Sequence, residues 1–174
     1  MDDIKHILLN LKAGKINNVY VLKGEDIFLQ NFFIEKLSNK LFLDSSCSKE
    51  FLTPNELSGK EILDKILSSD LFNSKKLIIL RDPQQIKGKV SKEIISYCGQ
   101  PIINHFLVLI CDNHLDKSSF FKNLSSKIPF INVSTPFQSQ MIKWANFFVK
   151  DNKKNISPDV LKEIINICGD SLYN

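Results

Sequence analysis

Hydrophobic residues along the first 137 positions fall into two patterns that alternate. Short continuous apolar runs predict buried strands, and apolar residues spaced three and four positions apart predict helices between them. The run Leu77–Leu80 is typical of a strand covered on both faces of a sheet. Strands are expected at 19–22, 47–52, 77–80, 106–111 and 130–133, with 47–52 at a sheet edge. Five strands alternating with helices predict an α/β fold, a parallel sheet with helices on both sides.

Polar residues mark where several of the intervening helices begin. Helical spacing covers 4–11, 29–41, 62–67, 94–98 and 120–124. Asp26 can cap the second of these helices, and Ser58 with Glu61 forms the sequence signature of a capping box before the third. Asp116 is expected to open the last one. These signals agree with the alternation of strands and helices.

The pattern changes after Thr135-Pro136, where two helical faces follow without a strand between them. Their apolar residues are Met141, Trp144, Ala145 and Phe148 in the first helix, and Leu161, Ile164, Ile165 and Cys168 in the second. Ser157-Pro158 is a cap followed by proline at the first helical position, and Gly169 is expected to end the second helix. Residues 138–174 therefore predict the beginning of a second, helical domain, with an α/β domain over 1–137.

The connection after the first strand lacks the residues of a phosphate-binding loop. Such a loop needs a glycine-rich arch, a lysine for the β- and γ-phosphates and a Ser or Thr for magnesium. Here Gly24 is followed by Glu25 and Asp26, whose carboxylates would repel a phosphate. The fold is typical of nucleotide-binding proteins, but this loop predicts that the chain binds no nucleotide.

Other candidate chemistry is weaker. Arg81-Asp82 follows a buried strand, as the magnesium-holding Asp of an ATPase does, but a simple strand end is the better interpretation. The segment Cys111–Asp116 gathers possible metal ligands at a spacing that matches no zinc pattern. His6, His105 and His114 are isolated in the sequence, so no catalytic pairing can be proposed. We expect no catalytic residue, cofactor or metal.

Composition narrows the function classes. The net charge is +4, with 22 Lys but one Arg, Arg81. Lysine is a hydrated point charge, whereas arginine reads phosphates and guanines with a rigid fork, so the excess favours weak DNA attraction over base reading. No run of 18 apolar residues occurs, and the four dispersed cysteines are expected to be reduced, as in a cytoplasmic protein. An ATPase or kinase-like domain and a DNA-binding domain remain as alternatives.

The segment Ser68–Ser74 joins a short helix to a central strand and carries two large apolar residues, Leu71 and Phe72, between small polar ones. Two interpretations fit this pattern. Either the two side chains pack back under the sheet, or they form an exposed anchor that enters a pocket of a partner.

The order and spacing of several segments resemble the delta subunit of the bacterial DNA polymerase III clamp loader. The segments are Val19–Leu29, Asp70–Arg81, Phe106–Leu109, Leu115–Lys117, Trp144 and Ile156–Leu172. The resemblance implies an AAA+-like, P-loop NTPase-type fold that has lost ATP binding, over about residues 1–137. It also implies a small helical lid domain from about residue 138, which would continue beyond residue 174 and be followed by a collar domain that this sequence does not contain.

The same resemblance implies a non-catalytic function within a DNA polymerase holoenzyme. Delta binds the beta sliding clamp and helps open it for loading onto DNA during replication, while other subunits hydrolyse ATP. The clamp-binding residues would be Leu71 and Phe72 with Asp70, which match the end of a clamp-binding peptide pattern; Ser68 and Ser69 depart from its Gln and first Leu. Further partners would be the other loader subunits, through the collar, and DNA, weakly or within the assembly. No membrane is expected.

Overall fold

Five parallel strands form a sheet in the structure of this chain. The structure is a computed structural model, and it describes residues 4–43, 46–69, 74–113, 115–124 and 128–168. The strands are β1 (Val19–Lys23), β2 (Cys47–Leu52), β3 (Lys75–Arg81), β4 (His105–Cys111) and β5 (Phe130–Asn132). Their order in the sheet is β2-β3-β4-β1-β5, and every pairing is parallel. The predicted parallel α/β sheet is confirmed, with β2 at one edge.

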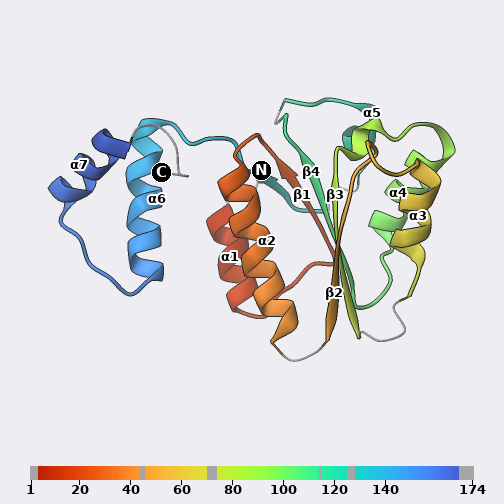
Figure 1. Ribbon diagram of the computed structural model, residues 1–174, viewed down its shortest axis with the longest axis horizontal. Helices are drawn as coiled ribbons and strands as arrows, with labels where there is room; N and C mark the ends of the chain where they lie inside the picture. Colours follow the sequence, from red (N-terminus) through yellow and green to blue (C-terminus); the bar gives the residue numbers. More distant parts are fainter. Residues whose placement is uncertain (1–3, 44–45, 70–73, 114, 125–127, 169–174) are drawn as a thin grey trace. The chain divides into compact units, whose positions relative to one another are not determined.

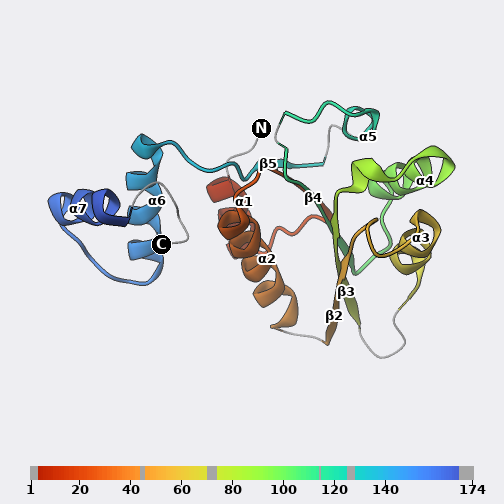
Figure 2. The same cartoon turned by 45° about the horizontal axis from the view of Figure 1, so that its top comes forward.

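Helices cover both faces of this sheet (Figures 1 and 2). They are α1 (Ile4–Lys12), α2 (Ile27–Phe42), α3 (Gly59–Leu67), the 3₁₀ turn η1 (Pro83–Gln85), α4 (Gly88–Gly99) and α5 (Ser119–Lys122). Helices α1 and α2 lie together on one face, and α3 and α4 lie on the other.

Burial of apolar side chains explains the arrangement. On the face of α2, the rings of Tyr20 and Phe33 meet edge to face with centroids 5.1 Å apart, and both side chains are buried. On the opposite face, Ile62 and Ile66 of α3 join Ile78 in a second apolar cluster. The central strands are therefore covered on both sides, as their continuous apolar runs predict.

The expectation for α5 was wrong in its extent. The helix begins after Ser118 and spans four residues, without Leu124. Asp116 does not cap it, because its Oδ1 accepts a hydrogen bond from the Ser118 amide at 2.7 Å within a local turn. A short Asx-type turn has thus taken the place of the first helical turn.

The chain divides into two compact units, Met1–Val133 and Ser134–Asn174. The second unit contains α6 (Gln138–Asp151) and α7 (Pro158–Cys168). Trp144 is buried and stacks on Phe148 with centroids 5.5 Å apart, and Leu161 is buried while Ile164 is 44% exposed. The assignment of 138–174 as the start of a lid domain stays a prediction.

In the described part of the chain, no helix combines the length and apolar character needed to cross a membrane.

Candidate functional site

The connection between β1 and α2 lies at the carboxyl edge of the sheet, where an α/β protein binds phosphate. Two of its three residues, Gly24 and Asp26, are bonded to neighbouring chain segments. The Gly24 amide donates to the Cys111 carbonyl at 2.9 Å, and the Asp26 amide donates to the Val133 carbonyl at 3.0 Å. Asp26 also caps α2 as predicted, because its Oδ1 accepts from the Leu29 amide at 2.9 Å. The amides of Gly24 and Asp26 are therefore used by the protein itself.

Lys23, the last residue of β1, is also engaged. Its side chain is buried, its Nζ donates to the Asp116 carbonyl at 2.6 Å, and the ammonium lies 4.9 Å from the centre of the Phe121 ring. The lysine adjacent to the connection thus holds the loop between β4 and α5.

A polar network of Gln30, Arg81 and Asp112 closes the same edge. Gln30 is fully buried on α2, and its Nε2 donates to the Gly24 carbonyl at 2.8 Å and to Asp112 Oδ1 at 2.9 Å. Its Oε1 accepts from Arg81 Nη2 at 2.9 Å. Arg81 Nη1 lies 2.6 Å from Asp112 Oδ1. The network joins the ends of β1, β3 and β4 through side chains. Arg81 contributes to it by binding both Gln30 and Asp112.

Gln30 was missed at the sequence level. A polar residue within the buried stripe of α2, next to Leu29 and near Phe33, was the available signal.

Asp82, the residue compared with a magnesium ligand, has φ of +53° and accepts from Gln84 Nε2 at 2.9 Å. Its side chain is thus used within the turn that leads into η1.

The predicted clamp-binding residues Asp70, Leu71 and Phe72 lie outside the described residues. The structure describes the two ends of their segment. Ser68 follows α3 and donates its amide to the Asp64 carbonyl at 2.9 Å. Ser74 precedes β3, and its Oγ donates to the Ser46 carbonyl at 3.1 Å. The end of α3 and the start of β3, which flank this segment in the sequence, thus lie at the amino edge of the sheet.

A buried lysine lies beside the first of these ends. Lys76, the second residue of β3, is 4% exposed. Its Nζ donates to the Lys65 carbonyl at 2.7 Å, to the Ser68 carbonyl at 3.2 Å and to Ser68 Oγ at 3.0 Å. Nζ also lies 3.6 Å from Glu50 Oε1 of β2. The ammonium thus binds the carboxyl end of α3, where the helix dipole favours a cation.

The structure describes most of the residues with possible catalytic or metal chemistry. Among the described residues, no group of three or more His, Cys, Asp and Glu side chains is placed to hold a metal ion. Burial raises the pKa of the Cys98 thiol to about 12, which keeps it protonated. Burial lowers the pKa of His105, and its Nδ1 has no hydrogen-bond partner. His114 lies outside the described residues.

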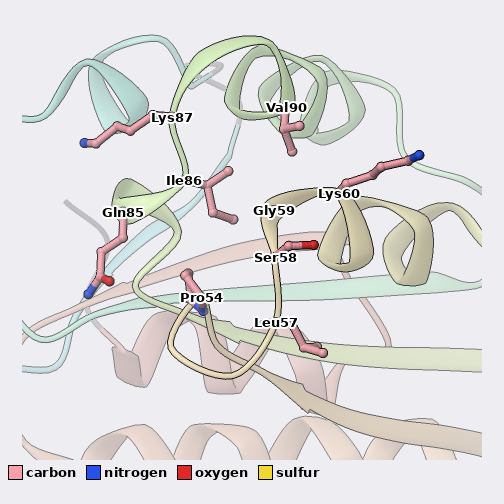
Figure 3. Close-up of a pocket in the computed structure, with 9 residues that line it drawn as sticks. All are labelled: Pro54, Leu57, Ser58, Gly59, Lys60, Gln85, Ile86, Lys87 and Val90. Atoms are coloured by element: carbon pink, nitrogen blue, oxygen red, sulfur yellow. The ribbon is translucent and has the colours of Figure 1, made fainter.

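A shallow cavity of about 330 Å³ lies between the start of α3 and the start of α4 (Figure 3). Ile86 and Val90 line it opposite Gly59, where a Cβ atom would meet Ile86 Cγ2 at 3.1 Å. The side chains of Lys60 and Lys87 extend away from it in opposite directions (Figure 3). The close approach at Gly59 accounts for the packing of these two helix ends.

The parallel sheet with the order β2-β3-β4-β1-β5 and helices on both faces is an AAA+-like fold. The chain belongs to the DNA polymerase III delta subunit family, because the model described as "DNA polymerase III, delta subunit" matches residues 20–134. A search of curated protein sequences finds no match.

Solved structures agree with this fold. The Bacillus subtilis DNA clamp loader delta protein is similar at a TM-score of 0.76 and 15% identity, over 93% of this chain and 51% of that one. Domain III of the Thermotoga maritima replication initiation protein DnaA is similar at a TM-score of 0.52 and 13% identity, over 98% of this chain and 77% of that one. The Thermotoga maritima RuvB Holliday junction branch migration motor is similar at a TM-score of 0.52 and 13% identity, over 91% of this chain and 52% of that one. The chain spans about half the length of the Bacillus subtilis protein.

Proposed function

We propose that this chain is the part of a clamp-loader delta subunit that binds the beta sliding clamp of DNA polymerase III and helps hold it open. The observation that carries the proposal is the family match over residues 20–134, which spans all of the sheet except Val19 and includes the segment between α3 and β3. In this account the chain performs no chemistry. It contributes binding energy to an assembly in which other subunits hydrolyse ATP.

The clamp-binding residues in this proposal are Leu71 and Phe72, with Asp70 at the edge of the contact. Full burial of a Leu or Phe side chain contributes about 1.5–3 kcal/mol. Two such side chains oppose an association cost of several kcal/mol. That balance gives a specific but reversible contact, which suits a subunit that must release the clamp after loading.

The carboxyl edge of the sheet supports a delta subunit that does not bind ATP. The Gly24 and Asp26 amides donate to protein carbonyls, and the Gln30–Arg81–Asp112 network lies beside them. A bound triphosphate would have to displace these interactions and would meet the carboxylates of Glu25 and Asp26. An active ATPase or kinase is the less favoured alternative for this reason.

DNA binding by the isolated chain is also less favoured. A DNA-binding domain would show strong, salt-dependent affinity through clustered cations. Here Arg81 pairs with Asp112 and the buried Lys76 pairs with Glu50. We propose that DNA and the other loader subunits are contacted within the full assembly, in the cytoplasm.

Titration of the chain against the sliding clamp of the same organism tests the proposal. Wild-type binding that is abolished by Leu71→Ala/Phe72→Ala is the expected result. Phe51→Ala is the matched control, because Phe51 is 65% exposed on the edge strand β2, away from the proposed anchor in sequence. The circular dichroism spectrum of each variant should match that of the wild type. Absence of wild-type binding would contradict the proposal.

A further inference from the structure

We propose that Lys76 is a positioning residue that fixes where the clamp-binding segment leaves α3, an inference that rests on the proposed function. Lys76 does not itself reach the clamp, because it is buried beneath the end of the helix. It acts through Ser68, the last described residue but one before the predicted anchor.

The geometry around the ammonium defines this role. All three hydrogen bonds of Lys76 Nζ go to the last turn of α3 and its cap, on the Lys65 carbonyl and on both oxygens of Ser68. The Ser68 backbone is extended, with φ of −66° and ψ of 135°. The lysine therefore binds the residue at which the chain stops being helical.

Glu50 holds the lysine in this position from the neighbouring strand. One carboxylate oxygen lies 3.6 Å from Lys76 Nζ, and the other lies 2.9 Å from Lys65 Nζ. The hydrogen bond from Lys65 lowers the pKa of Glu50, and the charge of Lys76 contributes to the same shift. The strands β2 and β3 and the end of α3 are thus joined by one charge cluster.

The far end of the segment is fixed independently. Ser74 donates its amide to Ser46 Oγ at 3.3 Å and its Oγ to the Ser46 carbonyl at 3.1 Å. Fixing the backbone of a flexible residue costs about 1–2 kcal/mol when it happens on binding. A segment whose two ends are already placed loses less of this entropy when its side chains enter a pocket.

Removal of the Lys76 ammonium acts directly on the end of α3. Lys76→Met keeps roughly the length of the side chain and removes the three hydrogen bonds to α3. The acceptors left without a donor lower the free energy of unfolding, since only the replacement of both members of a buried pair is often neutral. Clamp affinity is therefore compared under conditions in which each variant is folded, and the free energy of unfolding is measured beside it.

The test compares wild type, Lys76→Met and Lys75→Met in titrations against the sliding clamp. Lys75 is a matched control, because the charge change is the same and its Nζ donates to the Leu41 carbonyl of α2, at 3.3 Å. We expect Lys76→Met to bind about tenfold more weakly and Lys75→Met to bind as the wild type does. Amide hydrogen exchange at Ser68 should be faster in Lys76→Met, whereas exchange within β3 and β4 should be unchanged.

Unchanged clamp affinity of folded Lys76→Met would overturn the inference while leaving the proposed function intact. An equal loss in Lys75→Met would also overturn it, because net charge would then explain the effect. Should Lys76→Met fail to fold, Ser68→Ala provides the test. Ser68 is exposed, and this change removes its Oγ, one of the three atoms that accept hydrogen bonds from Lys76 Nζ. A two- to fivefold loss is expected there, and no loss would overturn the inference. Failure of the wild type to bind would instead contradict the proposed function.

Discussion

Arg81 Nη1 lies 2.6 Å from Asp112 Oδ1 and joins the carboxyl ends of β3 and β4. Both residues also contact the buried side chain of Gln30, which holds the Gly24 carbonyl in the turn after β1. This edge of the sheet is where proteins of the same fold class bind nucleotide. Here its loop is fixed by side chains of the protein.

The Gln30 side chain is expected to contribute more to stability than its exposed neighbours do. Gln30→Met keeps the volume but leaves the buried Gly24 carbonyl without its side-chain donor, which should lower the free energy of unfolding by about 1–3 kcal/mol. Urea denaturation measures the change. Asn31→Ala, at the next and exposed position, is the control and should change stability little. Equal stability of Gln30→Met and wild type would show that the network contributes nothing to the fold.

Magnesium-ATP is expected to leave the thermal midpoint of the chain unchanged. A ligand that binds the folded state raises the midpoint by mass action, and the loop of Gly24, Glu25 and Asp26 offers two carboxylates to a phosphate. Differential scanning fluorimetry at increasing ATP concentration measures this, with an active AAA+ ATPase as the positive control. A saturable rise in the midpoint would argue for the ATPase alternative.

Glu50 should make stability depend on pH in the acid range. Its pKa in the folded state is lowered from the ordinary 4.5, chiefly by the hydrogen bond from Lys65. The stabilisation is present above pH 4.5 and is lost as the pH falls through the lower pKa of the folded state. Glu50→Gln should therefore be less stable than wild type at pH 7, by about 1 kcal/mol, and the difference should vanish at acid pH.

Urea titrations of both proteins at several pH values test this dependence. Glu56→Gln is the control, because Glu56 is exposed on the turn after β2. A difference between wild type and Glu50→Gln that persists unchanged into the acid range would rule out the charge cluster as its cause.

The capping box of α3 predicts a separate effect. The Glu61 amide donates to Ser58 Oγ at 3.3 Å, and the Ser58 amide donates to Glu61 Oε2 at 2.8 Å. Ser58→Ala should lower the free energy of unfolding by about 1 kcal/mol. Ser96→Ala, on the exposed surface of α4, should have little effect in the same denaturation experiment. A Ser58→Ala protein as stable as the wild type would contradict this role of the cap.

The sheet could be predicted from sequence because its strands are continuous apolar runs. The caps at Asp26 and Ser58 were predictable for a similar reason, since each acts on residues three positions away. The start of α5 was not, because Asp116 had a competing local turn with Ser118. Local signals are therefore reliable here where one local interaction dominates.

The polar networks depend on residues far apart in the sequence, which pattern analysis does not bring together. Gln30 is 51 positions from Arg81 and 82 from Asp112. Lys76 directly precedes the predicted strand 77–80, and its interactions with the end of α3 follow only from the packing of that helix on the sheet. The clamp-binding role of Leu71 and Phe72 comes from the family resemblance and stays a prediction.

Amide hydrogen exchange of the chain, with and without the sliding clamp, tests the central claim most directly, because it reports the partner and the location together. We predict slower exchange on clamp addition in peptides covering residues 68–74, and no slowing in Leu71→Ala/Phe72→Ala. The edge strand β2 should exchange at the same rate in both conditions. Protection confined to another part of the chain, or none at saturating clamp, would contradict the account.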